Sequence, residues 1–188
     1  MTNTVGNVLQ GKPVTTGGIL IGTSGATLPT TPSGATTGFT VLGYVGDAGL
    51  AETQARTTDK IKAWGGDVVK VVQSEFSVSY TFTLLENSAA VLKAVHGSAN
   101  VTTTSATSSA GTLQSVKINA STMPKLPWIF DMIDGDAKIR VVVPLGQVTS
   151  VGDITYSDSG VIGYPVTLEA FSDGTAQAYK YIDNGVTV

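Results

Sequence analysis

The chain has 188 residues and a net charge of −3, and only 13% of its residues are charged. This length suits one domain with a sizeable core or at most two small ones, and the absence of cysteine excludes disulfides and thiolate metal sites. No apolar run reaches the roughly 20 residues that a membrane-spanning helix needs, and we expect no signal peptide, because the start lacks a basic and an apolar region.

The charges are unevenly distributed along the chain. Residues 1–125 hold eight bases and six acids, a net charge of +2, whereas residues 126–188 hold three bases and eight acids, a net charge of −5. Tight binding of nucleic acid needs clustered Lys and Arg to neutralise phosphates, so the acidic C-terminal third argues against it. A surface this poor in charge mildly favours burial against partner subunits.

The N-terminal part predicts an arm followed by a strand and a long loop. Residues 1–38 are rich in Thr, Gly and Pro, which predicts an extended arm with one strand at Gly18–Gly22. Residues 39–45 have strand composition. Residues 46–60 are predicted to be a long loop, and loops of this length are often functional or ordered by a partner. A mobile solvated loop, or one with a helical turn, remains the alternative.

The next segment predicts a hairpin and a two-faced strand. Gly65 and Gly66 precede Asp67 between two apolar runs, 61–64 and 68–72, as expected for a tight turn. Within residues 76–84, large apolar side chains alternate with Ser and Thr. Because successive strand side chains point to opposite faces, this pattern predicts a half-buried strand.

The pattern then changes to that of a short helix. Residues 89–96 are mostly good helix formers; Asn87 is the predicted N-cap and Gly97 the position just past the C-terminus. A helix this short needs packing against the sheet to persist. The Ser/Thr/Ala tract at 98–112 has no periodicity and predicts a flexible loop or hairpin tip.

The remainder predicts further strands. Residues 113–118 read as a strand, and the prolines of 123–127 argue against a central strand there. Asp134 and Gly135 predict a hairpin turn between strands 128–133 and 137–143. Two more strands are expected at 146–156 and 163–171, and residues 172–188 predict a turn and a C-terminal strand or arm with Tyr179 and Tyr181 on one face. Residues 1–188 are thus predicted to form a single, mainly β domain, a β-sandwich or partly rolled barrel with one flanking short α-helix.

No catalytic constellation is apparent, so the chain is not predicted to be an enzyme and no cofactor is expected. His96 is the sole histidine, and its place at a helix end favours a structural role. Asp131, Asp134 and Asp136 lack the spacing of a calcium loop. A hairpin turn explains Asp134 and Gly135 with less strain.

Several segments together resemble one protein family. They are Gly6–Pro13, Gly43–Val45, Lys62–Val69, Phe82–Glu86, Val91–Gly97 and Tyr164–Phe171. In this order they resemble the major tail proteins (tail tube proteins) of long-tailed, non-contractile phages, in particular those of phages that infect actinobacteria. The resemblance is densest from Ala63 to Gly97 and is lost over residues 98–125.

The resemblance implies a structural subunit of the virion tail, with assembly in the host cytoplasm. Copies would form stacked hexameric rings around a lumen that conducts DNA without specific binding, in contact with a tape measure protein, a tail terminator and distal tail proteins, and without a membrane. It implies that loop 46–60 contacts a neighbouring subunit; the candidate contact residues are Glu52, Arg56, Asp59 and Lys60. The acidic C-terminal third would supply lumen charge, and the candidates are Asp131, Asp134 and Asp136.

Two other classes remain open from the sequence. A β-sandwich binding module, for capsid decoration or for recognition of carbohydrate or a host surface at the tail tip, would expose aromatic side chains, and the two tryptophans are Trp64 and Trp128. A hydrolase would need a nucleophile and a base, and His96 offers the only imidazole.

Overall fold

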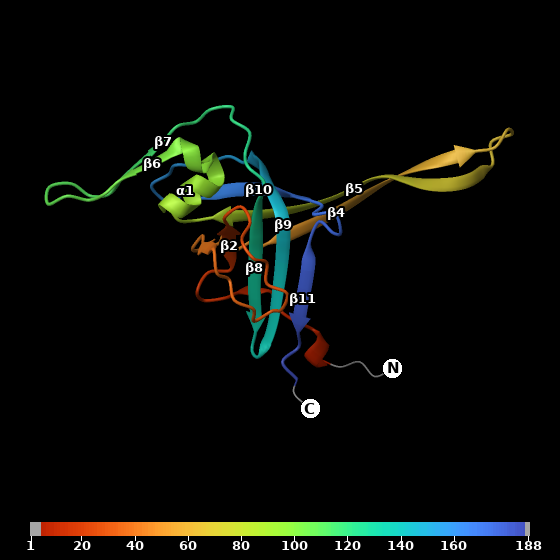
Figure 1. Ribbon diagram of the computed structural model, residues 1–188, viewed down its shortest axis with the longest axis horizontal. Helices are drawn as coiled ribbons and strands as arrows, with labels where there is room; N and C mark the ends of the chain where they lie inside the picture. The colour runs from red at the N-terminus through yellow and green to blue at the C-terminus, as the bar shows by residue number, and fades with distance from the viewer. Residues whose placement is uncertain (1–4, 187–188) are drawn as a thin grey trace.

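The computed structural model describes residues 5–186, which form a mainly antiparallel β structure with one α-helix (Figure 1). Its elements, in chain order, are η1 (Val5–Asn7), β1 (Lys12–Pro13), β2 (Ile19–Gly22), β3 (Phe39–Val41), β4 (Ala51–Lys62), β5 (Val68–Leu84), α1 (Ala89–His96), η2 (Ser98–Asn100), β6 (Val101–Thr104), β7 (Leu113–Val116), β8 (Leu126–Asp134), β9 (Ala137–Val151), β10 (Tyr164–Phe171) and β11 (Tyr179–Asp183). Among these residues no helix has the length and apolar character needed to cross a membrane.

One large sheet organises the molecule. Its strands follow the order β3-β2-β8-β9-β10-β5-β4, with β1 added alongside β8 and β11 alongside β9; β6 and β7 form a separate hairpin. The sheet does not close into a barrel, and the predicted mainly β, sandwich-like fold with one flanking helix is confirmed. Every pairing between its strands is antiparallel.

The main core lies inside the curve of this sheet. The apolar side chains of residues 78–84 alternate with polar ones, and Val78, Tyr80, Phe82 and Leu84 are buried, as the sequence pattern predicts. The ring of Phe82 lies 5.9 Å from Trp128 and 5.6 Å from Phe130, between ring centroids. Since β5 and β8 are separated by two strands in the sheet order, these contacts show that the sheet curls and packs on itself.

Helix α1 packs its apolar side against this core. Val91, Leu92, Ala94 and Val95 are buried. The N-cap is Ser88, whose Oγ accepts a hydrogen bond from the Val91 amide at 3.4 Å, so the predicted N-cap Asn87 is wrong by one residue. Asn87 Oδ1 instead accepts a hydrogen bond from the Tyr164 hydroxyl. Gly97 ends the helix with a φ of 89°, a conformation that favours glycine.

The opposite face of the sheet is partly covered by the segment 23–38. This segment lies over a small apolar cluster of Leu20, Ile129 and Val142, joined by Leu28 and Phe39. The predicted arm of residues 1–38 is therefore packed on the sheet where it is described, although residues 1–4 lie outside the described residues. It contributes β2 and also β1, a short strand that the sequence did not indicate.

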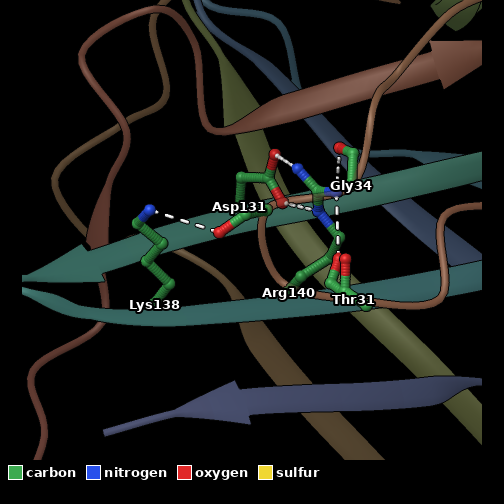
Figure 2. A network of polar contacts seen from close by, with 6 residues as sticks. Thr31, Gly34, Asp131, Lys138 and Arg140 are labelled. Carbon is green, nitrogen blue, oxygen red and sulfur yellow. Dashed lines mark hydrogen bonds and ion pairs between the residues drawn. The ribbon is translucent and has the colours of Figure 1, made fainter. Parts of the chain in front are cut away.

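A buried ion pair holds segment 23–38 in place (Figure 2). Arg140 on β9 donates two hydrogen bonds to the Asp131 carboxylate on β8, at 2.6 and 2.7 Å. Its remaining terminal nitrogen donates to the carbonyl of Thr31 at 3.2 Å and to that of Gly34 at 2.7 Å. Arg140 is only 5% exposed, so one guanidinium joins two sheet strands to the covering segment.

Two strand boundaries differ from the prediction. Strands expected separately at 137–143 and 146–156 form the single strand β9, which ends at Val151. Pro127 lies inside β8, at a register shift between Leu126 and Trp128. A bulge frees Pro127 from the ladder, which is why a proline is tolerated there. The predicted hairpin turn at Asp134 and Gly135 is confirmed, since Asp134 pairs with Ala137.

The C-terminal strand β11 lies against β9 and reaches the base of β4. The rings of Tyr179 and Tyr181 stack with centroids 6.5 Å apart, on one face as predicted. Lys180 Nζ lies 2.8 Å from a carboxylate oxygen of Glu52. Residues 187–188 of the predicted C-terminal arm lie outside the described residues.

Candidate assembly surface

The most conspicuous feature of the surface is a two-stranded ribbon that projects from the body (Figure 1). It comprises residues 53–75, the outer parts of β4 and β5 and their turn, and every one of these side chains is exposed. Strand β4 pairs with β5 from Ala51 to Lys62. At roughly 3.3 Å per residue, the six positions 57–62 alone carry the ribbon about 20 Å outward.

The ribbon corrects the loop predicted at residues 46–60. Residues 51–60 are strand, not loop. The sequence gives no alternation of polar and apolar side chains there, because neither face of the outer ribbon is buried and no pattern is imposed on it. The residues that remain outside a strand, 46–50, form a short turn in which the Gly49 amide donates to the Gly46 carbonyl at 2.9 Å.

The ribbon is bent by two irregularities in its pairing. The register shifts between Thr57 and Thr58 and again between Ile61 and Lys62, and in both places β5 holds the extra residue, first Ser74 and then Val69. The Ser74 hydroxyl donates to the Thr57 carbonyl at 3.3 Å. Such bulges increase local twist.

The outer end of the ribbon is unusually apolar for an exposed segment. The exposed large apolar side chains there are Ile61, Trp64, Val68, Val69, Val71 and Val72. The turn between the strands uses Gly65 and Gly66 at φ values of 111° and 98°, as the sequence predicts. An exposed apolar cluster on a rigid element is typical of a surface that a partner covers.

The four predicted contact residues all lie on β4, but they divide between its two faces. Strand alternation places Glu52, Arg56 and Lys60 on one face and Asp59 on the other. Only Arg56, Lys60 and Asp59 belong to the ribbon. The Arg56 guanidinium lies 4.2 Å from the centroid of the Phe76 ring and donates to Gln73 at 3.3 Å, so it already has intramolecular partners.

Glu52 lies at the base of the ribbon and is tied to the body. Burial raises the pKa of Glu52, but hydrogen bonds from Lys180 and Gln54 outweigh burial, and the net pKa is lowered. Beside it, the Tyr80 hydroxyl is buried and has no hydrogen-bond partner within bonding geometry among the described residues. Burial, and then the negative charge of Glu52, raise the pKa of Tyr80.

The three predicted lumen carboxylates lie together near the β8–β9 turn but differ in their surroundings. Asp131 is paired with Arg140. Asp134 accepts a hydrogen bond from the Gln10 amide at 3.0 Å. Asp136 is exposed in the turn. Only Asp136, and in part Asp134, therefore present an unneutralised carboxylate to the outside.

A broad hydroxyl-rich face extends across the open part of the sheet, on the side away from the main core. Its members pair across β4, β5, β10 and β9 in register, for example Thr53 with Ser79 and Thr81 with Thr167. Residues opposite each other share a face, and this face comprises Thr53, Ser77, Ser79, Thr81, Thr83, Gln147, Thr167 and Glu169. Glu169 is the one charged member of this set, and next to it Lys125 Nζ lies 3.6 Å from the centroid of the Phe171 ring. The alternation in residues 76–84 indicated only the β5 part of it.

The described residues hold no cluster of three or more His, Asp or Glu side chains that could bind a metal ion. His96 packs edge-on against Tyr164 with ring centroids 6.3 Å apart, and burial lowers the pKa of His96. This environment is that of a packed side chain at the end of α1.

Comparison with known proteins identifies one family. A family model described as "Phage tail tube protein" matches residues 11–188. A search of curated proteins found no match to the chain. The matched range includes the ribbon, the hydroxyl-rich face and the helix.

Proposed function

The chain belongs to the phage tail tube protein family and is a structural subunit of the virion tail, and on this premise we propose that its copies assemble into stacked hexameric rings around a lumen that conducts DNA. The single observation that carries the proposal is the ribbon of residues 53–75. A lone subunit leaves its apolar end and both of its backbone edges uncovered. Assembly of many copies covers such features, and ring closure removes free sheet edges.

Most of the range 46–60 is part of the ribbon, and we propose that the ribbon makes the inter-subunit contact that was predicted for this loop. Arg56, Asp59 and Lys60 remain the proposed polar contacts to a neighbouring subunit. Glu52 has a different place in the proposal: its ion pair with Lys180 fixes the base from which the ribbon projects. Exposed polar contacts of this kind contribute mainly to register and specificity.

We propose that the hydroxyl-rich face lines the lumen. The small neutral side chains of this face offer DNA phosphates no cation to bind, Glu169 adds weak repulsion, and the nearby Lys125 is held over the Phe171 ring, so DNA would slide past without adhering. Asp134 and Asp136 remain candidates for additional negative charge near the lumen. Asp131 is a weaker candidate because Arg140 neutralises it.

In the virion the ends of such a tube need different partners. We propose a tape measure protein inside the tube during assembly, and a tail terminator and distal tail proteins at its two ends. Subunits would be held in the host cytoplasm before assembly. The ribbon supports this proposal, because the last subunits of a tube leave their contact surface uncovered and another protein must bind it there.

Trimming the ribbon tests the proposal. Residues 59–72 are replaced by Asn-Gly, which joins the paired residues Thr58 and Gln73 through a two-residue turn. The matched control replaces residues 104–113 by the same dipeptide and shortens the β6–β7 hairpin between Thr103 and Gln114. Circular dichroism confirms folding, and electron microscopy of concentrated protein scores tubes.

We expect tubes from the wild type and from the control, and folded subunits without tubes from the ribbon variant. Tubes of normal appearance from the ribbon variant would contradict the role of the ribbon. A wild-type protein that stays monomeric at high concentration, and binds glycans through the exposed Trp64, would instead support the alternative of a binding module.

A further inference from the structure

A groove in the body of the molecule, on the side of α1, has an apolar floor. It lies between α1, β2 and the segment that leads into β8, with a volume of about 490 Å³. Its lining includes Ala90, Ala94, Met123, Leu126 and Trp128. Pockets of this size, with few polar groups, are suited to hold large apolar side chains.

The chain itself carries side chains of matching chemistry. Trp64 at the ribbon end is fully exposed, and Ile61 and Val69 beside it are also exposed. Aromatic anchors that enter apolar pockets contribute much of the energy of protein interfaces. In Figure 1 the ribbon projects to the right, away from the body, and α1 lies on the left side of the body, so the ribbon can reach such a groove only on a second copy.

One charge near each feature lies close to the proposed contact, and these two charges are opposite in sign. Of the described residues that line the groove, Lys93 alone is charged. Of residues 63–67, which form the ribbon turn, Asp67 alone is charged, and Lys62 and Lys70 lie on the two strands next to the turn. An apolar anchor with one opposite charge pair beside it would fix both the depth and the orientation of docking.

We infer that the ribbon end of one copy docks in the α1 groove of the next copy, with Trp64 buried there and Asp67 beside Lys93. The contact joins two different surfaces, so each copy both gives and receives a ribbon, and repetition of this contact generates a ring or a stack. The inference rests on the proposed function, because it names the surface that receives the ribbon in the assembled tube.

Crosslinking tests the inference directly, because the chain has no cysteine. The double variant Asp67→Cys with Lys93→Cys is assembled and treated with a short bismaleimide. We expect a ladder of linked oligomers in denaturing gels. The matched control, Asp67→Cys with Ser108→Cys, places the second thiol on the exposed β6–β7 connection near the same end of the molecule, and should give no ladder.

A second measurement does not depend on the charged pair. In wild-type protein, assembly should shield Trp64 from acrylamide, whereas the Ser24→Arg and Ser98→Arg double variant, which narrows the groove from its exposed rim, should abolish both tubes and shielding. Charge reversal at Asp67 or Lys93 alone should weaken assembly at low salt, and reversal of both should restore it.

The outcomes separate the two proposals. If tubes form but Asp67→Cys does not crosslink to Lys93→Cys, and Trp64 of the wild-type tubes stays accessible to acrylamide, the groove assignment is overturned and the tube function stands. If wild-type protein forms no tubes at all, the proposed function fails and the groove assignment fails with it.

Discussion

At the scale of single residues, Arg140 shows how a charged side chain can organise a covering segment. Its guanidinium satisfies the Asp131 carboxylate and two backbone carbonyls of the segment 23–38. The sequence offered Asp131 as a candidate lumen charge; it predicted the hairpin of residues 128–143 but not its register, which sets Asp131 directly opposite Arg140. Register, not composition, determined its partner.

Removing the arginine should therefore destabilise the subunit. We expect Arg140→Ala to lower the free energy of unfolding by about 3–5 kcal/mol, because the Asp131 charge is left buried without a partner. The double variant Arg140→Met with Asp131→Leu should lose less free energy of unfolding than Arg140→Ala, because it leaves no buried charge without a partner. Urea denaturation followed by the fluorescence of buried Trp128 measures both, with Lys138→Ala as an exposed control. A loss below about 0.5 kcal/mol for Arg140→Ala, the range usual for surface substitutions, would contradict this role.

Glu52 should contribute a pH-dependent part of the stability. Its pKa in the folded state lies below the ordinary value of 4.5, so the folded state favours the carboxylate. The stabilisation is then fully present above pH 4.5 and is lost as the pH falls from there through the folded-state pKa. In both Glu52→Gln and Lys180→Gln we expect stability to decrease less with falling pH than in wild type. Urea midpoints from pH 7 to pH 3 measure this decrease. An unchanged slope in both variants would show that the Lys180 contact contributes nothing in solution.

At the scale of elements, the sequence predicted strands well where one face is buried and poorly where none is. The alternation in residues 76–84 identified β5, and the Asp134–Gly135 turn identified the β8–β9 hairpin. The outer part of β4 was expected to be loop, because Thr, Gln, Ala and Arg in open solvent carry no periodicity. Its pairing with the apolar run of β5 holds it extended.

The cap of α1 offers a test at this scale. Ser88→Ala removes the side-chain acceptor of the Val91 amide and should lower the free energy of unfolding by about 1 kcal/mol. Ser88→Asp should retain most of the stability, because aspartate is an equally good cap. Thermal unfolding measures the change, and Ser105→Ala in the exposed β6–β7 connection is the control. Equal melting temperatures for Ser88→Ala and wild type would exclude a capping contribution.

At the scale of the whole molecule, the sheet divides its two faces between different tasks. The inner face forms the main core with α1. The other face is covered by segment 23–38 at the β2–β8 end and is open and hydroxyl-rich over β10, β5 and β4. The candidate lumen could be predicted only in part from the sequence, because two separate parts of the chain, β4–β5 and β9–β10, contribute to it.

Positive charge on the open face should hinder DNA passage. We expect Thr81→Lys with Ser77→Lys, both exposed members of this face, to leave tube assembly intact but to slow DNA ejection, since each lysine adds a phosphate contact. The effect should diminish as salt rises. Ejection kinetics of particles carrying the variant measure this, with Thr103→Lys on β6 as the control. If the lysine variant and wild type eject DNA at the same rate at low salt, the hydroxyl-rich face does not line the lumen.

The two bulges of the ribbon bear on how free subunits are stored before use. Flat, regular edges recruit any extended chain, whereas a kinked and twisted edge accepts only a partner with the same kinks. We therefore expect the extra residues Ser74 and Val69 to leave the edge competent for a cognate copy and poor at seeding fibrils. Free subunits would then reach the concentration at which nucleation begins without loss to irreversible precipitation.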